Sequence, residues 1–215
     1  MYEYASGLIR VLGKKILDQN DFERMLGAKT AADAFKVLND TDYADNLFGL
    51  KPEGFEKALK RDEKDLKKLF FKIIDNELLL DFLFLKQDYL KLKLYLKAKF
   101  NPELKKSRVR PNLKIPRIKN PTSEKIDKIC DIELYKKRKK IAKKLRDKFL
   151  QKICKKDLDL NYDLDFIKTE ARNYAYGTPI ILEYYFKKLN ASRKMRTIMN
   201  AKLNNISQEE LSKNI

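Results

Sequence analysis

Apolar residues recur at intervals of three and four along almost the whole chain of 215 residues. No run of four to eight residues alternates apolar and polar side chains, as a half-buried strand does. A period near 3.6 residues is typical of helices that bury one face. The pattern therefore predicts an all-α protein.

In the first hundred residues, apolar spacing and capping residues predict five helices. The hydroxyl of Thr30 is expected to cap the third helix by accepting a hydrogen bond from an exposed backbone N–H. Asp75 and Asn76 are expected to separate the two longest helices. The predicted ranges are 4–18, 21–26, 30–39, 52–74 and 78–99.

Residues 101–123 interrupt this pattern with four of the six prolines and seven Lys or Arg residues. Proline lacks a backbone N–H and biases the residue before it toward extended conformations. We therefore expect a basic, proline-rich linker or loop here. It would separate an N-terminal helical block, residues 1–100, from a C-terminal helical block, residues 124–215.

Capping residues also divide the C-terminal block. Ser123 and Asp131 are expected to cap a helix or helix pair that reaches residue 156. A further helix is expected from about residue 164 to 176. Gly177-Thr178-Pro179 should stop it and start a helix that runs to about residue 202. Capping-box spacing at residues 207–210 predicts a last short helix.

The composition disfavours enzyme chemistry. Histidine is absent, which removes the commonest general base and the commonest metal ligand. None of the six glycines forms a phosphate-binding loop of the Gly-x4-Gly-Lys-Ser/Thr type. We predict no catalytic residue, no metal site and no cofactor, and therefore a protein that is not an enzyme.

Two other kinds of candidate site have plainer interpretations. Acidic clusters occur at residues 62–65 and 157–165, and the second has the alternation of a cation-binding loop but lacks the central Gly and the terminal Glu that a calcium-binding loop requires. We interpret them as capping and surface residues. Cys130 and Cys154 lie in Lys-rich helical sequence without zinc spacing, so we expect ordinary helix residues in a reducing compartment.

The hydropathy predicts a chain that lies outside the bilayer. The most apolar run, residues 77–85, contains Asp81 and is far shorter than the roughly 20 residues that a membrane-spanning helix needs. The N-terminus has no charged segment followed by an apolar one, as a signal peptide would. A role at a membrane surface remains open.

The net charge of +18 is concentrated in one stretch. Residues 1–100 hold 19 basic and 17 acidic groups, residues 101–156 hold 21 and 6, and residues 157–215 hold 9 and 8. Such a stretch suits nucleic acid, an anionic lipid surface or an acidic protein. A general preference for lysine is an equally good explanation of its helical part. Residues 101–123 contain no aromatic residue on which bases could stack, which disfavours nucleic acid.

Three groups of motifs occur in order along the chain. The opening segment contains Tyr2-Glu3-Tyr4-Ala5, and a later segment ends in Leu38-Asn39-Asp40-Thr41-Asp42-Tyr43. The next helices contain the ranges 55–59 and 85–93, and the C-terminal part contains residues 176–179, 184–188, 195–198 and 201–206. Together these resemble the C subunit, also called the d subunit, of the V/A-type rotary ATPases. That family opens with a Tyr-x-Tyr-Ala helix, continues with a helix that ends in Leu-x-x-Thr-x-Tyr, and has a C-terminal signature similar to the last group.

The resemblance implies a funnel-like bundle of related helical repeats. It also implies a non-catalytic central-stalk subunit that couples the soluble rotor shaft to the membrane rotor ring, for proton or sodium transport. Such a subunit would lie peripherally on the cytoplasmic face of the membrane, with anionic lipid headgroups as possible further partners. The alternative is a basic helical nucleic-acid-binding protein. For the partner interface we predict Arg108, Arg110, Lys114, Arg117, Tyr184, Tyr185, Lys188, Arg193 and Arg196.

Overall fold

Every regular element in the described residues is a helix, as the apolar spacing predicts. The structure is a computed structural model, and it describes residues 2–101, 113, 116, 118, 121–155 and 164–206. The all-α prediction is confirmed for this part of the chain. The funnel of related repeats stays a prediction.

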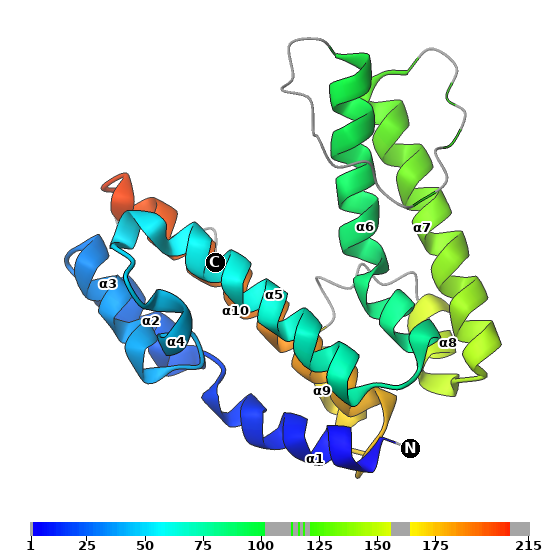
Figure 1. Cartoon of the computed structure of the whole chain (residues 1–215), viewed down its shortest axis with the longest axis horizontal. Helices are drawn as coiled ribbons and strands as arrows, with labels where there is room; N and C mark the ends of the chain where they lie inside the picture. The colour runs from blue at the N-terminus through cyan, green and yellow to red at the C-terminus, as the bar shows by residue number, and fades with distance from the viewer. Residues whose placement is uncertain are drawn as a thin grey trace. The chain divides into compact units, whose positions relative to one another are not determined.

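Contacts divide the chain into two units. Unit 1 consists of Met1–Asp75 and Leu160–Ile215, and unit 2 consists of Asn76–Asp159. Unit 1 thus joins the two ends of the chain, whereas unit 2 is one continuous segment (Figure 1). The division expected from composition separates two helical blocks, residues 1–100 and 124–215, by a linker at residues 101–123. It does not coincide with the boundaries of the two units, and the linker stays a prediction.

Unit 1 contains seven α-helices and three short 3₁₀ helices in its described residues. The α-helices are α1 (Glu3–Leu12), α2 (Gln19–Gly27), α3 (Ala31–Val37), α4 (Ala44–Leu47), α5 (Phe55–Ile73), α9 (Leu164–Ala171) and α10 (Thr178–Leu203). The 3₁₀ helices are η1 (Gly13–Lys15), η2 (Leu38–Asp40) and η3 (Pro52–Gly54).

Short polar side chains start the small helices of unit 1. Thr30 accepts a hydrogen bond from the backbone N–H of Asp33, which confirms the predicted cap of α3. Asp18 and Asp21 cap α2 reciprocally, each carboxylate accepting from the other residue's backbone N–H. These bonds satisfy amides that a helix leaves without partners at its first turn.

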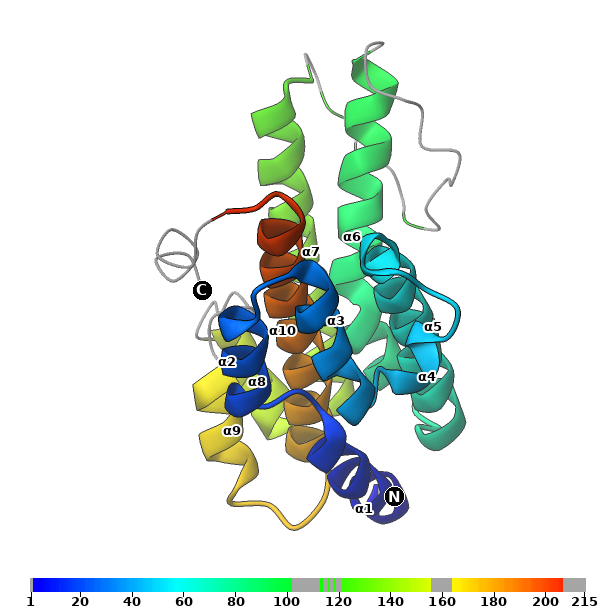
Figure 2. The same cartoon turned by 90° about the vertical axis from the view of Figure 1, so that its left-hand side faces the viewer.

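The helix α10 is the central element of unit 1. It contacts α1, α2, α3, α5 and α9 (Figure 2). Near its C-terminal end, the Lys202 ammonium donates to the carbonyls of Leu26 and Ala28, both at 2.6 Å, and so binds the end of α2. Buried residues occur on nearly all sides of the first half of α10, which explains why its sequence lacks a single apolar stripe.

Unit 2 is a long helical hairpin with one additional short helix. Its elements are α6 (Glu77–Phe100), α7 (Ser123–Leu145) and α8 (Lys148–Lys155). The pairing of Lys97 with Asp127 and of Lys93 with Asp131, both at 2.7 Å, shows that α6 and α7 run antiparallel (Figure 1). Between them lies an apolar core that includes Leu92, Leu96, Ile126 and Cys130.

Several helix ends differ from the sequence prediction. Thr122, not Ser123, caps α7 by accepting from the N–H of Lys125. Asp131 does not cap a helix, because α7 continues through it. Its carboxylate instead pairs with Lys93 of α6. Gly177 is the N-cap of α10, with a φ of 113° that favours glycine, and α9 ends at Ala171 rather than near 176. The helix expected at residues 207–210 lies outside the described residues.

Candidate functional site

Lys188 of α10 is the most unusual charged residue in the described part of the chain. Its side chain is 3% exposed, and its ammonium contacts Asp62 of α5 at 2.6 Å and Asp42 at 2.8 Å. Asp42 lies between η2 and α4. One cation therefore joins three segments that are distant in the sequence.

Tyr43 completes this cluster. The Lys188 ammonium lies 4.2 Å from the centroid of the Tyr43 ring, which stabilises the cation through the negative face of the ring. The Tyr43 hydroxyl is 2.9 Å from the hydroxyl of Ser192, one helical turn beyond Lys188 on α10. The ring is fully buried, so both its face and its hydroxyl are used.

Burial shifts the titration of the acidic members. It raises the pKa of both Asp42 and Asp62, and the charge and hydrogen bonds of Lys188 offset only part of that effect. Burial also raises the pKa of Tyr43 well above its usual value. Two buried carboxylates that share one cation carry a net negative charge when both are ionised, which gives a physical reason for the upward direction.

Three of the motifs that resemble the rotary-ATPase family, those at the start of the chain, at residues 38–43 and at the C-terminal end, meet in unit 1. Thr41, Asp42 and Tyr43 end the second motif, and Lys188 belongs to the C-terminal signature. Ser6, which follows the opening Tyr-x-Tyr-Ala motif, accepts a hydrogen bond at 3.0 Å from the N–H of Gly177, where the C-terminal signature begins. Distant motifs are thus in contact through specific polar groups.

Arg10 of α1 extends this junction. Its guanidinium donates to the backbone carbonyl of Tyr174 at 3.0 Å, close to the start of α10. Together with the bond between Ser6 and Gly177, this contact holds the first helix against the turn that precedes α10. Residues in and beside the opening and C-terminal motifs therefore hold two parts of unit 1 together.

The predicted interface residues have three different locations. Tyr184, Tyr185 and Lys188 are buried in unit 1, so their side chains do not reach the surface on which a partner would dock. They are buried because α10 is surrounded by other helices there: both tyrosine rings contact Phe70 of α5, for example. The predicted partner interface therefore rests on the six remaining Arg and Lys residues rather than on these three.

Arg193 and Arg196 are exposed on α10. Arg196 donates to both carboxylate oxygens of Glu56, at 2.6 and 3.2 Å, and this pair links α10 to α5 at the surface. The hydrogen bond to Glu56 raises the pKa of the Arg196 guanidinium above its usual value. Arg108, Arg110, Lys114 and Arg117 lie outside the described residues, so their interface role stays a prediction.

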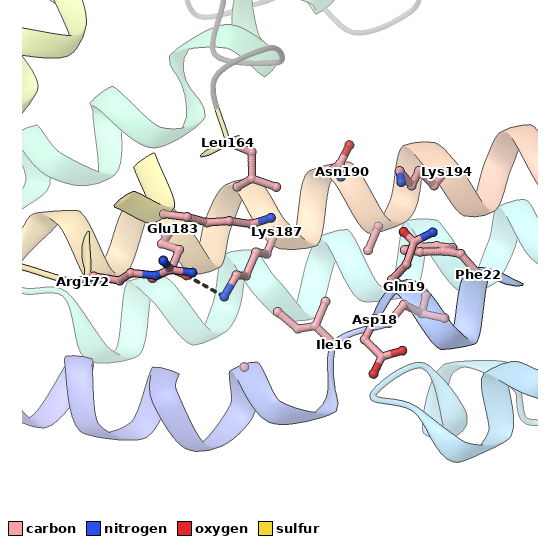
Figure 3. A pocket seen from close by; sticks show the side chains of 14 residues that line it. Ile16, Asp18, Gln19, Phe22, Leu164, Arg172, Glu183, Lys187, Asn190 and Lys194 are labelled. Atoms are coloured by element: carbon pink, nitrogen blue, oxygen red, sulfur yellow. Dashed lines mark ion pairs between the residues drawn. The ribbon is translucent and has the colours of Figure 1, made fainter. Parts of the chain in front are cut away.

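A groove of about 540 Å³ runs beside α10. Figure 3 shows a polar row of α10 side chains along it, formed by Glu183, Lys187, Asn190 and Lys194. The segment Gly13–Phe22 and the helix α9 provide the other walls. Its charged lining contains four cations, Lys168, Arg172, Lys187 and Lys194, and two carboxylates, Asp18 and Glu183. Lys187 pairs with Glu183 at 2.6 Å and Lys168 with Asp165 at 3.5 Å, so the excess of positive charge that favours an acidic ligand comes from Arg172 and Lys194.

Sequence reasoning missed the role of Asp62. We interpreted residues 62–65 as surface and capping positions, but Asp62 is 6% exposed and pairs with Lys188. The position has a sequence signal: it is three or four residues from the apolar Leu59 and Leu66, on the buried face of α5. A carboxylate on an apolar stripe indicates a buried partner of opposite charge.

The described residues contain no group of three or more potential metal ligands that could bind an ion together. None of the helices in the described ranges has the length and the apolar content to span a bilayer. Both cysteines are buried and unpaired thiols, and burial raises the pKa of each. They are helix residues on α7 and α8, as their sequence context predicts.

Comparison with known proteins identifies the family. The model of the ATP synthase (C/AC39) subunit family matches residues 5–134, which is more than half of the chain. No curated protein and no solved structure matches the chain significantly. The matched family consists of non-catalytic subunits of membrane-associated V/A-type ATPases. The chain therefore belongs to the ATP synthase (C/AC39) subunit family, the rotary-ATPase family that its sequence motifs resemble.

Proposed function

We propose that this chain is a central-stalk subunit that couples the soluble rotor shaft of a V/A-type ATPase to its membrane rotor ring. In this role it performs no chemistry and serves proton or sodium transport by transmitting torque. It would lie peripherally on the cytoplasmic face of the membrane. Family membership gives the complex, and the construction of unit 1 supports the mechanical role.

The observation that carries the proposal is the buried contact of Lys188 with Asp42 and Asp62. A part that transmits torque has to resist deformation, and close-packed interiors with fixed polar contacts do so. The ammonium fixes α10 relative to α5 and to the turn before α4. Without a cation there, two buried carboxylates would repel each other, so the alternative arrangements of these segments are unfavourable.

For the partner surface of unit 1 we propose the groove beside α10 together with the exposed Arg193. Its excess of cations suits an acidic segment of another subunit, because charge complementarity determines register and suppresses wrong partners. Lys187 and Lys194 line the groove, and Arg193 lies beside them on the same helix. This replaces the buried Tyr184, Tyr185 and Lys188 as the expected contact residues.

Recovery of ATPase subunits from membranes with a tagged full-length chain tests the proposal. We expect shaft and ring subunits to be recovered together with the chain. Lys187→Glu combined with Arg193→Glu and Lys194→Glu should lower the recovery of the shaft by about tenfold or more. Lys57→Glu combined with Lys60→Glu and Lys64→Glu, at exposed positions of α5, reverses the same number of charges elsewhere and should leave the recovery of the shaft unchanged.

Two results would count against the proposal. Recovery of no ATPase subunit by the wild-type chain contradicts the coupling role. An equal loss with the α10 and α5 variants contradicts the partner surface alone. Recovery of RNA or DNA in place of ATPase subunits, with binding that weakens as salt rises, would favour the nucleic-acid-binding alternative.

A further inference from the structure

The second half of α7 has an unusual concentration of positive charge. Residues 136–146 contain eight Lys or Arg among eleven positions, and no Asp or Glu occurs between Glu133 and Asp147. The helix α5 of unit 1 is also rich in lysine, but Glu56, Asp62 and two further carboxylates are interspersed there. A general preference for lysine would be expected to give α7 a similar mixture, so the absence of carboxylates from residues 134–146 favours a specific role for this segment over that explanation.

The lysines of this segment share one face. Lys136, Lys139, Lys140 and Lys143 follow the i, i+3, i+4, i+7 spacing of one side of a helix, and all four are exposed. The opposite side of α7, with Cys130, Ala142 and neighbouring apolar residues, is buried. We call these four residues together with the adjacent, exposed Lys144 the lysine face.

Internal contacts account for little of this charge. Among the described residues, Lys136 is the one member of the lysine face in an ion pair, with Glu133 at 3.1 Å on the surface. Attraction between cations and the C-terminal end of the helix dipole is confined to the last turn. It therefore explains Lys143 and Lys144, but not Lys136, Lys139 or Lys140.

We propose that the lysine face binds the anionic headgroups of a phospholipid surface. Clusters of four to eight basic residues on a helix are attracted to such a surface, and each charge contributes to the binding. A helix that lies along the surface brings all five ammonium groups to the headgroups together. This inference rests on the proposed function for its setting, because a central-stalk subunit works next to a membrane.

The chemistry of the face favours lipid over the other polyanions. Protein interfaces are depleted in lysine and enriched in arginine and aromatic residues, whereas the exposed basic residues of segment 136–146 are five lysines and one arginine, Arg146. Single-stranded nucleic acid is held by stacking on aromatic rings. The helix α7 contains one aromatic residue, Tyr135, which is partly buried and whose ring centroid lies 5.9 Å from the Lys139 ammonium, so the face offers no row of rings for successive bases. Point charges on flexible stems suit mobile headgroups.

Co-sedimentation of the purified full-length chain with vesicles tests this proposal. The test compares vesicles of equal parts phosphatidylserine and phosphatidylcholine with vesicles of phosphatidylcholine alone. The chain should bind the first kind, not the second, and should dissociate as salt is raised from about 50 mM to about 500 mM. Replacing Lys136, Lys139, Lys140 and Lys143 by Gln should weaken binding by about tenfold or more.

Two matched variants control for total charge and folding. Replacing Lys57, Lys60, Lys64 and Lys72 of α5 by Gln removes the same four charges and should change binding by about twofold or less. Replacing the four lysines of α7 by Arg keeps their charge and should keep the binding. Circular dichroism of each variant verifies that the helices are intact.

Several outcomes would overturn the proposal. The first is that the wild-type chain does not bind the phosphatidylserine vesicles at low salt. The second is that the α5 and α7 variants lose binding equally, which would assign the effect to net charge. If vesicle binding is absent while membranes still yield ATPase subunits, the lipid proposal fails and the proposed function stands. Tighter binding of RNA than of vesicles through the same lysines would assign the face to nucleic acid.

Discussion

In unit 1, Lys188 is 3% exposed and contacts two carboxylates, whereas in unit 2 five lysines of α7 lie in solvent on one face. The total charge of the units follows the same division. Unit 1 has 23 Lys and Arg residues against 20 Asp and Glu, and unit 2 has 26 against 11. Unit 1 therefore has nearly balanced charge, whereas unit 2 has a large positive excess, part of which lies on the exposed lysine face.

The cores of the units differ correspondingly. The described core of unit 2 between α6 and α7 is apolar, and its ion pairs, Lys93 with Asp131 and Lys97 with Asp127, lie at its border. Unit 1 has a charged cluster inside. An apolar core tolerates small rearrangements, because hydrophobic packing is non-directional. A buried ion pair has one low-energy arrangement, since its groups have no other partner. Unit 1 therefore has buried polar contacts that fix its geometry, whereas the distinguishing feature of unit 2 is its exposed basic face.

The largest test of this difference is the substitution Lys188→Met. Methionine has a similar length, but it leaves Asp42 and Asp62 buried without their cation. Removing one partner of a buried pair costs about 3–5 kcal/mol. We expect a loss of this size in the free energy of unfolding, measured with urea and followed by hydrogen exchange of the unit 1 amides.

Lys140→Met on α7 is the matched control. Lys140 is exposed, so its loss should change the free energy of unfolding by about 0.5 kcal/mol or less. Adding Asp42→Asn and Asp62→Asn to Lys188→Met removes the uncompensated charges and should restore part of the stability. Equal losses from the Lys188 and Lys140 substitutions would show that the buried cluster contributes no more than an exposed lysine does.

Sequence patterns were sufficient for the helices but not for their assembly. The two long helices predicted at 52–74 and 78–99 correspond to α5 with the preceding η3, and to α6. Their boundaries depend on local signals, such as Asn76, whose side chain caps α6. The short α4 was missed, because four residues are too few to show a helical period.

The contacts of the candidate site were not predictable in the same way. Lys188 and Asp62 are 126 positions apart, and nothing in their local sequence names the partner. Lys188 follows another lysine, Lys187, which is partly exposed, so composition alone cannot tell which of the two is buried. The family resemblance marked the right segments, but our interface prediction placed Tyr184, Tyr185 and Lys188 at a partner surface, whereas all three are buried.

The next test is Leu96→Ala in unit 2. Leu96 is fully buried between α6 and α7, and its truncation should cost about 3 kcal/mol, within the range for a leucine-to-alanine change in a core. Leu94→Ala is the control, because Leu94 is 64% exposed on the same helix. Hydrogen exchange should show the loss in α6 and α7. We thus expect the two units to unfold independently. An equal loss of protection in the amides of unit 1 would show instead that the two units unfold as one cooperative body.

The smallest expected effect concerns pH. Burial raises the pKa of Asp42 in the folded chain, so above the usual carboxyl value of 3.8 the unfolded chain releases this proton first. The folded state then binds more protons than the unfolded state, and its stability falls as pH rises toward the folded pKa. Asp42→Asn removes this contribution and leaves Lys188 paired with Asp62. We expect the variant to lose less stability than the wild type as pH rises above the usual carboxyl value of 3.8 toward the folded pKa, in urea titrations at successive pH values. Asp45 is exposed and three residues away, so Asp45→Asn should leave the dependence of the free energy of unfolding on pH unchanged. The same pH dependence in both variants would mean that Asp42 pairs with Lys188 without any net burial penalty.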